Sequence, residues 1–135
     1  MRVLLAEDNA MNREIALHIL EKAGLVITAV EDGKQALDTF TASAAGTFRA
    51  ILMDVQMPVM DGYEATRMIR QSAHPDAKTI PIIAMTANAF TADVNAALTA
   101  GMNSHIAKPI DYKRFFRILA ELTKTETHEG ERNDG

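Results

Sequence analysis

Cysteine and tryptophan are both absent from this 135-residue sequence, and no apolar run approaches the roughly 20 residues that a membrane-spanning helix needs. The lack of cysteine excludes disulfides and thiolate metal sites. Positive charge is also scarce, because 14 Lys and Arg residues face 18 Asp and Glu residues and the formal net charge is −4. Such a chain has no general attraction for nucleic acid or anionic membranes. We therefore predict a soluble, cytoplasmic module that itself contacts neither nucleic acid nor membrane.

One globular domain is expected from the length and composition. Hydrophobic residues make up 47% of the chain and charged residues 24%, which is enough apolar material for a single core. Short apolar runs predict strands at residues 2–6, 25–30, 50–53, 80–85 and 104–107. Apolar residues at helical spacing predict helices between and after them, at 11–23, 36–40, 63–70, 90–100 and 111–122.

The last residues of the chain differ from the rest. Segment 123–135, TKTETHEGERNDG, contains no apolar residue, so it cannot repay the entropy lost on ordering. We expect the domain to end near Leu122 and residues 123–135 to form a flexible polar tail or linker. In the helix before this tail, the Phe115 and Phe116 pair is expected to be half core, with its exposed half available to a partner.

The alternation of strands and helices predicts an α/β fold. Strands that alternate with helices form βαβ units, which give a parallel sheet with right-handed crossovers and helices on both faces. The carboxyl ends of such strands meet at one edge of the sheet, and ligands of open α/β sheets bind in the crevice outside that edge. The residues that follow each strand are therefore the candidates for chemistry.

Polar residues with a common chemistry stand at these strand ends. Glu7 and Asp8 follow the first strand and Asp54 ends the third. Three carboxylates in one crevice repel one another, and a hard divalent cation such as Mg²⁺ makes the cluster tolerable. Thr86 at the fourth strand and Lys108 after the fifth add a hydroxyl and an ammonium group, which suit a transferring phosphoryl group. Asp54 is the candidate nucleophile, because a carboxylate can form an aspartyl phosphate.

Four motifs of the sequence resemble the signature set of a known family. The motifs are LLAEDN, LMDVQMPVMDG, IIAMTANAF and HIAKPI, and together they are similar to the response-regulator receiver domains of two-component signalling. The resemblance covers Met1 to about Leu122. It implies a flavodoxin-like sandwich of three layers, with a five-stranded parallel sheet in the order 2-1-3-4-5 and five helices. It also implies a phosphorelay, in which phosphoryl transfer from a phosphohistidine to Asp54 switches conformation and partner binding.

The resemblance implies a set of metal ligands. Asp8 would bind Mg²⁺ directly, Glu7 would bind it through a water molecule, and Asp54 would bind it by its carboxylate. Gln56 would bind it by its backbone carbonyl. The implied partner is a histidine kinase or a histidine phosphotransfer protein.

The resemblance also implies a phosphate-binding set and a switch. Thr86, the backbone N–H of Ala87 and Lys108 would bind the phosphoryl oxygens, and the Lys108–Pro109 bond would be cis. His105 stands where the family usually carries a tyrosine or phenylalanine that moves inward together with the threonine on activation. The histidine ring is polar and titrates near neutrality, so its burial costs more than that of phenylalanine. Thr86 and His105 are the candidate switch residues.

The sequences of these motifs look most like those of receivers appended to hybrid sensor histidine kinases. No kinase sequence is present. We therefore expect either a receiver excised from a hybrid kinase, which can itself be membrane-anchored, or a stand-alone receiver. We expect a monomer or weak dimer. We also expect that it catalyses only its own phosphorylation and dephosphorylation and is otherwise not an enzyme.

Two alternatives to the switch remain open. One is a receiver-shaped docking module that is not phosphorylated in the cell. The other, weaker one is a hydrolase with an aspartyl-phosphate intermediate, because Gln56 stands where a general-acid aspartate would be needed.

Several polar residues carry no predicted chemistry. Asp61 before Gly62 is interpreted as a turn or cap residue. His18, His74 and His128 lack metal-ligand spacing and are interpreted as surface residues.

Overall fold

Strands and helices alternate along the chain in the computed structural model, which describes the backbone of residues 1–87 and 91–134 and the side chains of residues 1–87 and 94–123. The strands are β1 (Arg2–Ala6), β2 (Val26–Val30), β3 (Ala50–Asp54), β4 (Ile82–Thr86) and β5 (Ser104–Ala107). The helices are α1 (Ala10–Lys22), α2 (Gly33–Thr41), α3 (Gly62–Gln71), α4 (Thr91–Ala100) and α5 (Tyr112–Asp134).

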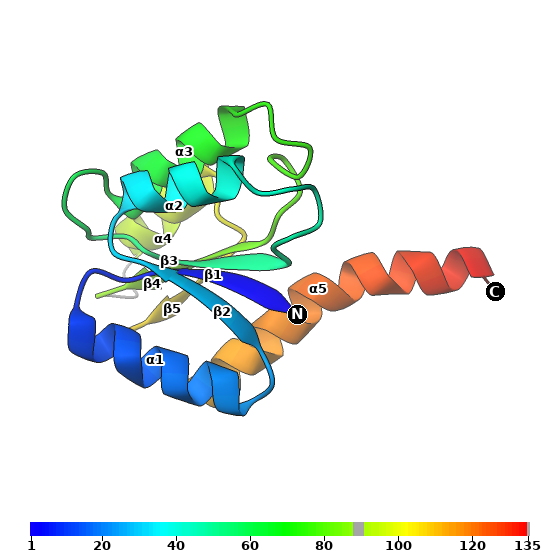
Figure 1. The fold of residues 1–135 in the computed structure, drawn as a ribbon, viewed down its shortest axis with the longest axis horizontal. Coiled ribbons are helices and arrows are strands. Elements are labelled where there is room, and N and C mark those ends of the chain that lie inside the picture. Colours follow the sequence, from blue (N-terminus) through cyan, green and yellow to red (C-terminus); the bar gives the residue numbers. More distant parts are fainter. Residues whose placement is uncertain (88–90, 135) are drawn as a thin grey trace.

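The five strands form one parallel sheet in the order β2-β1-β3-β4-β5. Helices α1 and α5 cover one face of the sheet, and α2, α3 and α4 cover the other (Figure 1). This is the three-layer α/β arrangement predicted from the sequence, with the predicted strand order. Central strand β3 is buried at all five positions, which explains its unbroken apolar run. Its place in the strand order puts Asp54, its last residue, at the middle of the carboxyl edge.

Alternate residues of the central strands build two separate cores. Ile51 and Met53 of β3 point toward α2 and α3, whereas Leu52 points toward α1 and α5. The largest buried side chains of the first core include Phe40, Ile69 and Ile82, and those of the second include Leu5, Leu20, Ile83 and Phe115. Both cores therefore hold the sheet from which the polar strand ends project.

Side-chain caps fix the start of the helices that follow the carboxyl edge. The side chains of Asn9, Asp32 and Asp61 accept hydrogen bonds from backbone N–H groups three residues later, over 2.9, 2.8 and 2.8 Å. Asp61 is thus the N-cap of α3, as its position before glycine predicted. In the part of the chain that the structure describes, the loops after β1, β2 and β3 thus end at capped helix starts.

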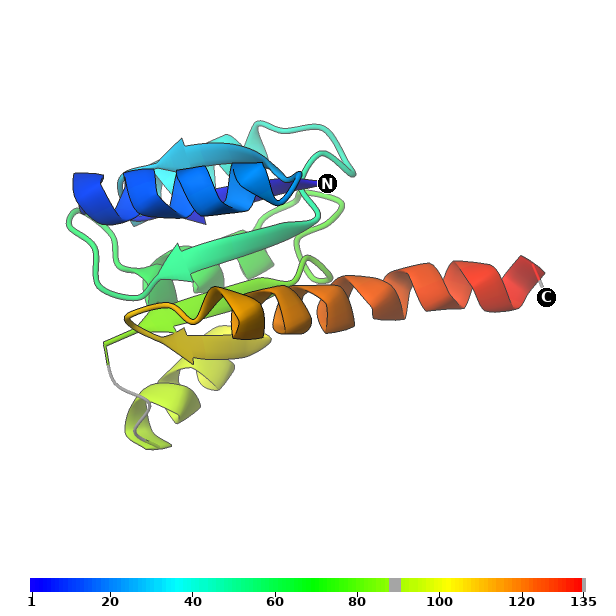
Figure 2. The same cartoon turned by 90° about the horizontal axis from the view of Figure 1, so that it is seen from below.

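The last helix is longer than the sequence predicted. Its backbone continues through the polar segment to Asp134 and projects beyond the sheet (Figure 2). The segment contains no proline, and adding a residue to an existing helix costs far less than starting a new one. The expected helix end at Leu122 was therefore wrong, and the use of this segment as a linker stays a prediction.

Two smaller expectations concern the start of α4 and the surroundings of His74. The helix expected from Phe90 is seen from Thr91, and Phe90 lies outside the described residues. His74 is not a plain surface residue, because its ring packs 4.3 Å from that of Phe40 and its Nδ1 accepts a hydrogen bond from the N–H of Asp76. No helix of the described residues has the length and apolar content to cross a membrane.

Candidate functional site

Three carboxylates gather at the carboxyl edge of the sheet. Glu7 and Asp8 follow β1, Asp54 ends β3, and one oxygen from each lies within 4.8 Å of the others. Glu7 and Asp54 are buried, with 3% and 2% of their surface exposed, whereas Asp8 is open to solvent. The structure therefore brings together the three acidic residues that the sequence nominated.

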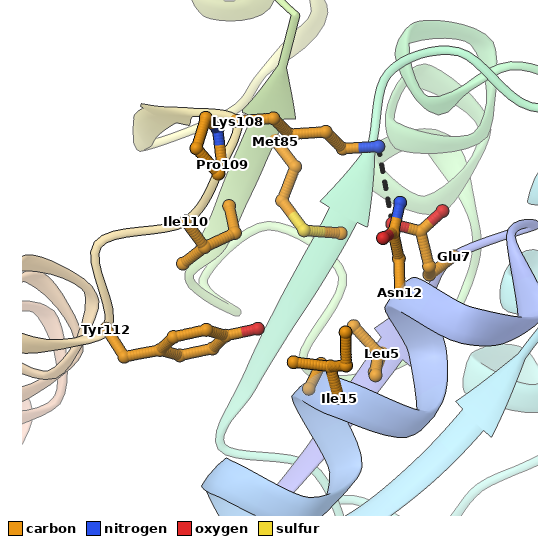
Figure 3. A pocket seen from close by; sticks show the side chains of 10 residues that line it. Leu5, Glu7, Asn12, Ile15, Met85, Lys108, Pro109, Ile110 and Tyr112 are labelled. Carbon is orange, nitrogen blue, oxygen red and sulfur yellow. Dashed lines mark ion pairs between the residues drawn. The ribbon is translucent and has the colours of Figure 1, made fainter.

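Lys108 reaches into this cluster from the loop after β5. Its Nζ lies 2.7 Å from Oδ2 of Asp54 and 3.3 Å from Oε1 of Glu7, and the second of these ion pairs is visible in Figure 3. Burial by itself lowers the pKa of Lys108, but the hydrogen bond to Asp54 and the charges of Asp54 and Glu7 outweigh it, so the pKa lies above its ordinary value. The ammonium group is therefore charged at neutral pH.

Backbone N–H groups orient the two buried carboxylates. The N–H of Gln56 donates to Oδ1 of Asp54 over 3.1 Å, and that of Asn9 donates to Oε2 of Glu7 over 3.1 Å. Asp54 thus has one oxygen on Lys108 and the other on the loop that follows it. Gln56 itself is exposed, and metal binding by its backbone carbonyl stays a prediction.

Thr86 is the last residue of β4 and is 1% exposed. Its hydroxyl is buried without a hydrogen-bond partner among the residues that the structure describes. A buried hydroxyl without a partner costs free energy. The hydroxyl of Thr66 in α3 is also unpartnered among the described residues, but that of Thr86 stands at the carboxyl edge of the sheet, where a ligand would complete it. Ala87 follows directly and is exposed.

The end of β5 supplies the remaining predicted residues. His105 is half-buried and pairs in register with Ala84, a core residue on the α2 and α3 side of the sheet. Its place therefore fits an edge-strand switch residue, and the switch itself stays a prediction. The Lys108–Pro109 bond is cis, as the resemblance implied.

A pocket of about 240 Å³ adjoins the acidic cluster between α1 and the loop that leads to α5 (Figure 3). Its walls are mostly apolar, and Glu7, Asn12, Lys108 and Tyr112 give it its polar atoms. Burial, together with the charge of Glu7, raises the pKa of the Tyr112 hydroxyl. The pocket makes Lys108 approachable from the α1 side.

Two residues at the site were missed from the sequence. Gly62 begins α3, and a Cβ atom there would collide with the backbone carbonyl oxygen of Asp54. Arg13 in α1 donates a hydrogen bond to the backbone of Glu7. A glycine after an aspartate resembles any turn and an arginine in an amphipathic helix resembles any surface residue, so neither carried a signal of its own.

Comparison with known families identifies the family to which this fold belongs. The sequence profile of the response regulator receiver domain matches residues 3–120. This chain belongs to the response regulator receiver domain family. The receiver domain is a module of two-component signalling.

Curated relatives of this receiver domain include hybrid histidine kinases and a small response regulator. Hybrid signal transduction histidine kinase I of Dictyostelium discoideum is 41% identical over 87% of this chain, and histidine kinase 1 of Arabidopsis thaliana is 37% identical over 92%. The chain spans only 7% and 13% of these two proteins. Two-component response regulator ORR41 of Oryza sativa subsp. japonica is 41% identical over 90% of the chain, which spans 94% of that protein.

Solved receiver domains share the fold over most of both chains. The receiver domain of sensor histidine kinase PA1611 from Pseudomonas aeruginosa, with magnesium coordinated in its active-site cleft, has a TM-score of 0.81 and 41% identity, covering 91% of this chain and 97% of that one. The receiver domain of Ssk1 from Saccharomyces cerevisiae, crystallised with the histidine phosphotransfer protein Ypd1, has a TM-score of 0.81 and 27% identity, covering 93% of this chain and 90% of that one.

Proposed function

We propose that this receiver domain accepts a phosphoryl group on Asp54 from a phosphohistidine and thereby changes its conformation and partner binding. One observation carries the proposal: the Asp54 carboxylate is held between a cationic Lys108 and two further carboxylates, beside a buried threonine hydroxyl that has no partner among the described residues. A docking module would not need these charged groups, and the burial of Glu7, Asp54 and part of Lys108 would only cost it stability.

The acidic cluster fits Mg²⁺. Its three carboxylates are hard oxygen donors that converge within 4.8 Å, and the exposed side of Asp8 leaves room for the water ligands that Mg²⁺ retains. Three carboxylates and the ammonium of Lys108 carry a formal charge of −2, which a divalent cation balances. Glu7, Asp8 and Asp54 would hold the ion, with the Gln56 carbonyl as a further ligand. When bound, Mg²⁺ supplies positive charge opposite the phosphoryl oxygens.

The residues of the chain supply the rest of the transfer. A carboxylate oxygen of Asp54 forms the new O–P bond while the P–N bond of the phosphohistidine breaks, and the leaving imidazole takes up a proton. Lys108, which contacts the same carboxylate, would pair with a phosphoryl oxygen. The Thr86 hydroxyl and the Ala87 N–H would bind the others, which would give the buried hydroxyl its missing partner.

The partner that donates the phosphoryl group would dock beside the pocket. Met11 and Ile15 of α1 are 72% and 48% exposed, and Ile15 also lines the pocket next to Lys108. Exposed apolar side chains next to a reaction site mark a contact surface. We propose a histidine kinase or a histidine phosphotransfer protein as this partner. We also propose that the domain is part of a hybrid histidine kinase in the cytoplasm and that it has no enzymatic activity toward other substrates.

The first test is intact-protein mass spectrometry after incubation with acetyl phosphate. We expect the protein to gain the mass of one phosphoryl group, in a reaction that requires Mg²⁺. Asp54→Asn should abolish the gain, because an amide neither attacks phosphorus nor completes the metal site. Asp61→Asn is the matched control, since asparagine caps a helix as well as aspartate does and Asp61 lies outside the cluster. An unmodified parent protein that nevertheless binds Mg²⁺ would favour the docking module.

A second test uses two glycines with similar packing. A Cβ at Gly62 would collide with the carbonyl oxygen of Asp54, and one at Gly33 would collide with that of Met60. Both alanine variants should lose about 2 kcal/mol of stability in urea unfolding, because backbone must shift. Only Gly62→Ala should also slow phosphoryl uptake, by about tenfold or more, since it displaces Asp54 itself. Equal uptake rates in the two variants would mean that the Asp54 backbone position is not critical.

A further inference from the structure

Arg13 connects helix α1 to the backbone of the acidic pair. Its Nη1 donates to the carbonyl oxygen of Glu7 over 2.9 Å and, more weakly, to that of Asp8 over 3.4 Å. Its Nη2 lies 3.7 Å from Oε1 of Glu31 in the turn after β2. The guanidinium group is thus spread between two loops at the carboxyl edge, with 19% of the side chain exposed.

These contacts add to others that fasten the same loop. The N–H of Glu7 donates to the carbonyl of Val30 over 3.1 Å, and the N–H of Arg13 donates to the carbonyl of Asn9 over 2.9 Å. Arg13 therefore belongs to the first turn after the cap and reaches back with its side chain to the residues before it. The backbone carbonyls of Glu7 and Asp8 face the guanidinium group of Arg13. The side-chain carboxylates of the same two residues lie together with that of Asp54.

We infer that Arg13 is a positioning residue for the Mg²⁺ site, acting through the backbone of Glu7 and Asp8; this inference rests on the proposed function. Groups that hold metal ligands in place commonly contribute a large part of metal affinity. The guanidinium offers one nitrogen to the carbonyl oxygens of Glu7 and Asp8 and a second to the carboxylate of Glu31, and the single nitrogen of lysine cannot reproduce this arrangement.

Because Arg13 is positively charged, an electrostatic role and a positioning role predict opposite changes in Mg²⁺ affinity when it is substituted. A positive group near a cation site repels the cation, so removing its charge alone would tighten Mg²⁺ binding. Removing a group that holds the ligands would weaken it. The direction of the change in Mg²⁺ affinity therefore separates a positioning role from a simple electrostatic effect.

The experiment is a Mg²⁺ titration by calorimetry of the parent protein and three variants. We expect Arg13→Gln to raise the Kd for Mg²⁺ about tenfold. Arg13→Lys should also raise it, although the charge is kept, and it serves alone if the glutamine variant does not fold. Arg67→Gln, the same change at an exposed position of α3, should leave the Kd unchanged. At saturating Mg²⁺ the rate of phosphoryl uptake should return to that of the parent protein.

A metal-free readout accompanies the titration. The N–H of Asn9 is bonded to Oε2 of Glu7, so its hydrogen exchange reports on the order of the loop without Mg²⁺. Exchange at Asn9 should accelerate in both Arg13 variants and stay unchanged in Arg67→Gln. A parent protein that binds Mg²⁺, with Arg13 variants that bind it equally or more tightly, would overturn this inference alone. A parent protein that binds no Mg²⁺ would instead overturn the proposed function.

Discussion

Lys108→Met is expected to slow phosphoryl uptake at Asp54 by about 100-fold, the cost of removing one preorganised charged donor from a transition state that gathers negative charge. The reason lies in the contacts of Lys108, whose Nζ is 2.7 Å from Oδ2 of Asp54. Methionine fills a similar volume along the stem but offers no donor to a phosphoryl oxygen. Mass spectrometry over time with acetyl phosphate at saturating Mg²⁺ measures the effect.

The same substitution should change stability in a way that depends on Mg²⁺. Without the metal, the substitution leaves the buried carboxylates of Glu7 and Asp54 without their shared cation. Breaking a buried ion pair from one side costs about 3 kcal/mol or more. Because Mg²⁺ can replace the missing charge, it should raise the melting temperature of Lys108→Met more than that of the parent protein.

Two controls separate the role of Lys108 from a general loss of charge. Lys108→Arg keeps the charge and should retain much of the stability without Mg²⁺. Lys113→Met removes a positive charge from an exposed position of α5 and should change neither uptake nor stability. Uptake by Lys108→Met at the rate of the parent protein would contradict the role given to this residue.

The fold was largely predictable because its strands are short and buried. A run such as Ala50 to Met53 between turn residues can hardly be anything but a strand covered on both faces, and such strands alternate with helices of clear apolar spacing. Alternation alone gives a parallel sheet but does not fix the strand order, which came from the family resemblance. The gathering of Glu7, Asp8 and Asp54 followed from their places after strands, since the carboxyl ends of parallel strands share an edge.

Features that depend on side-chain direction or on remote contacts were not predictable. The link from Arg13 to the Glu7 carbonyl needs the rotamer of a long side chain, and the packing of His74 on Phe40 needs the placement of the loop after α3 against helix α2. The unpartnered hydroxyl of Thr86 depends on which groups fail to reach it. The continuation of α5 reflects cooperative helix growth, which a composition argument about burial leaves out.

Phe115→Ala should be the most destabilising of these substitutions, with a loss of about 4 kcal/mol, which is a large part of the about 5–15 kcal/mol that holds a domain of this kind folded. Phe115 is fully buried in the core beneath α1 and α5, together with Leu5, Leu52 and Ile106. Alanine would leave a cavity that the rigid central strands cannot close. The sequence predicted the Phe115 and Phe116 pair to be half core.

Phe116→Ala is the matched control for this prediction. The two rings lie 5.6 Å apart, but Phe116 is only partly buried at the edge of the same core, so its loss should cost about 1 kcal/mol. Urea unfolding with equal m values in the parent protein and both variants measures the difference directly. Equal losses in the two variants would mean that the contact between the rings, and not the burial of Phe115 against the sheet, stabilises α5. A larger loss of stability for Phe115→Ala would mean that the buried ring of Phe115 attaches α5 to the sheet and so also holds the loop that carries Lys108.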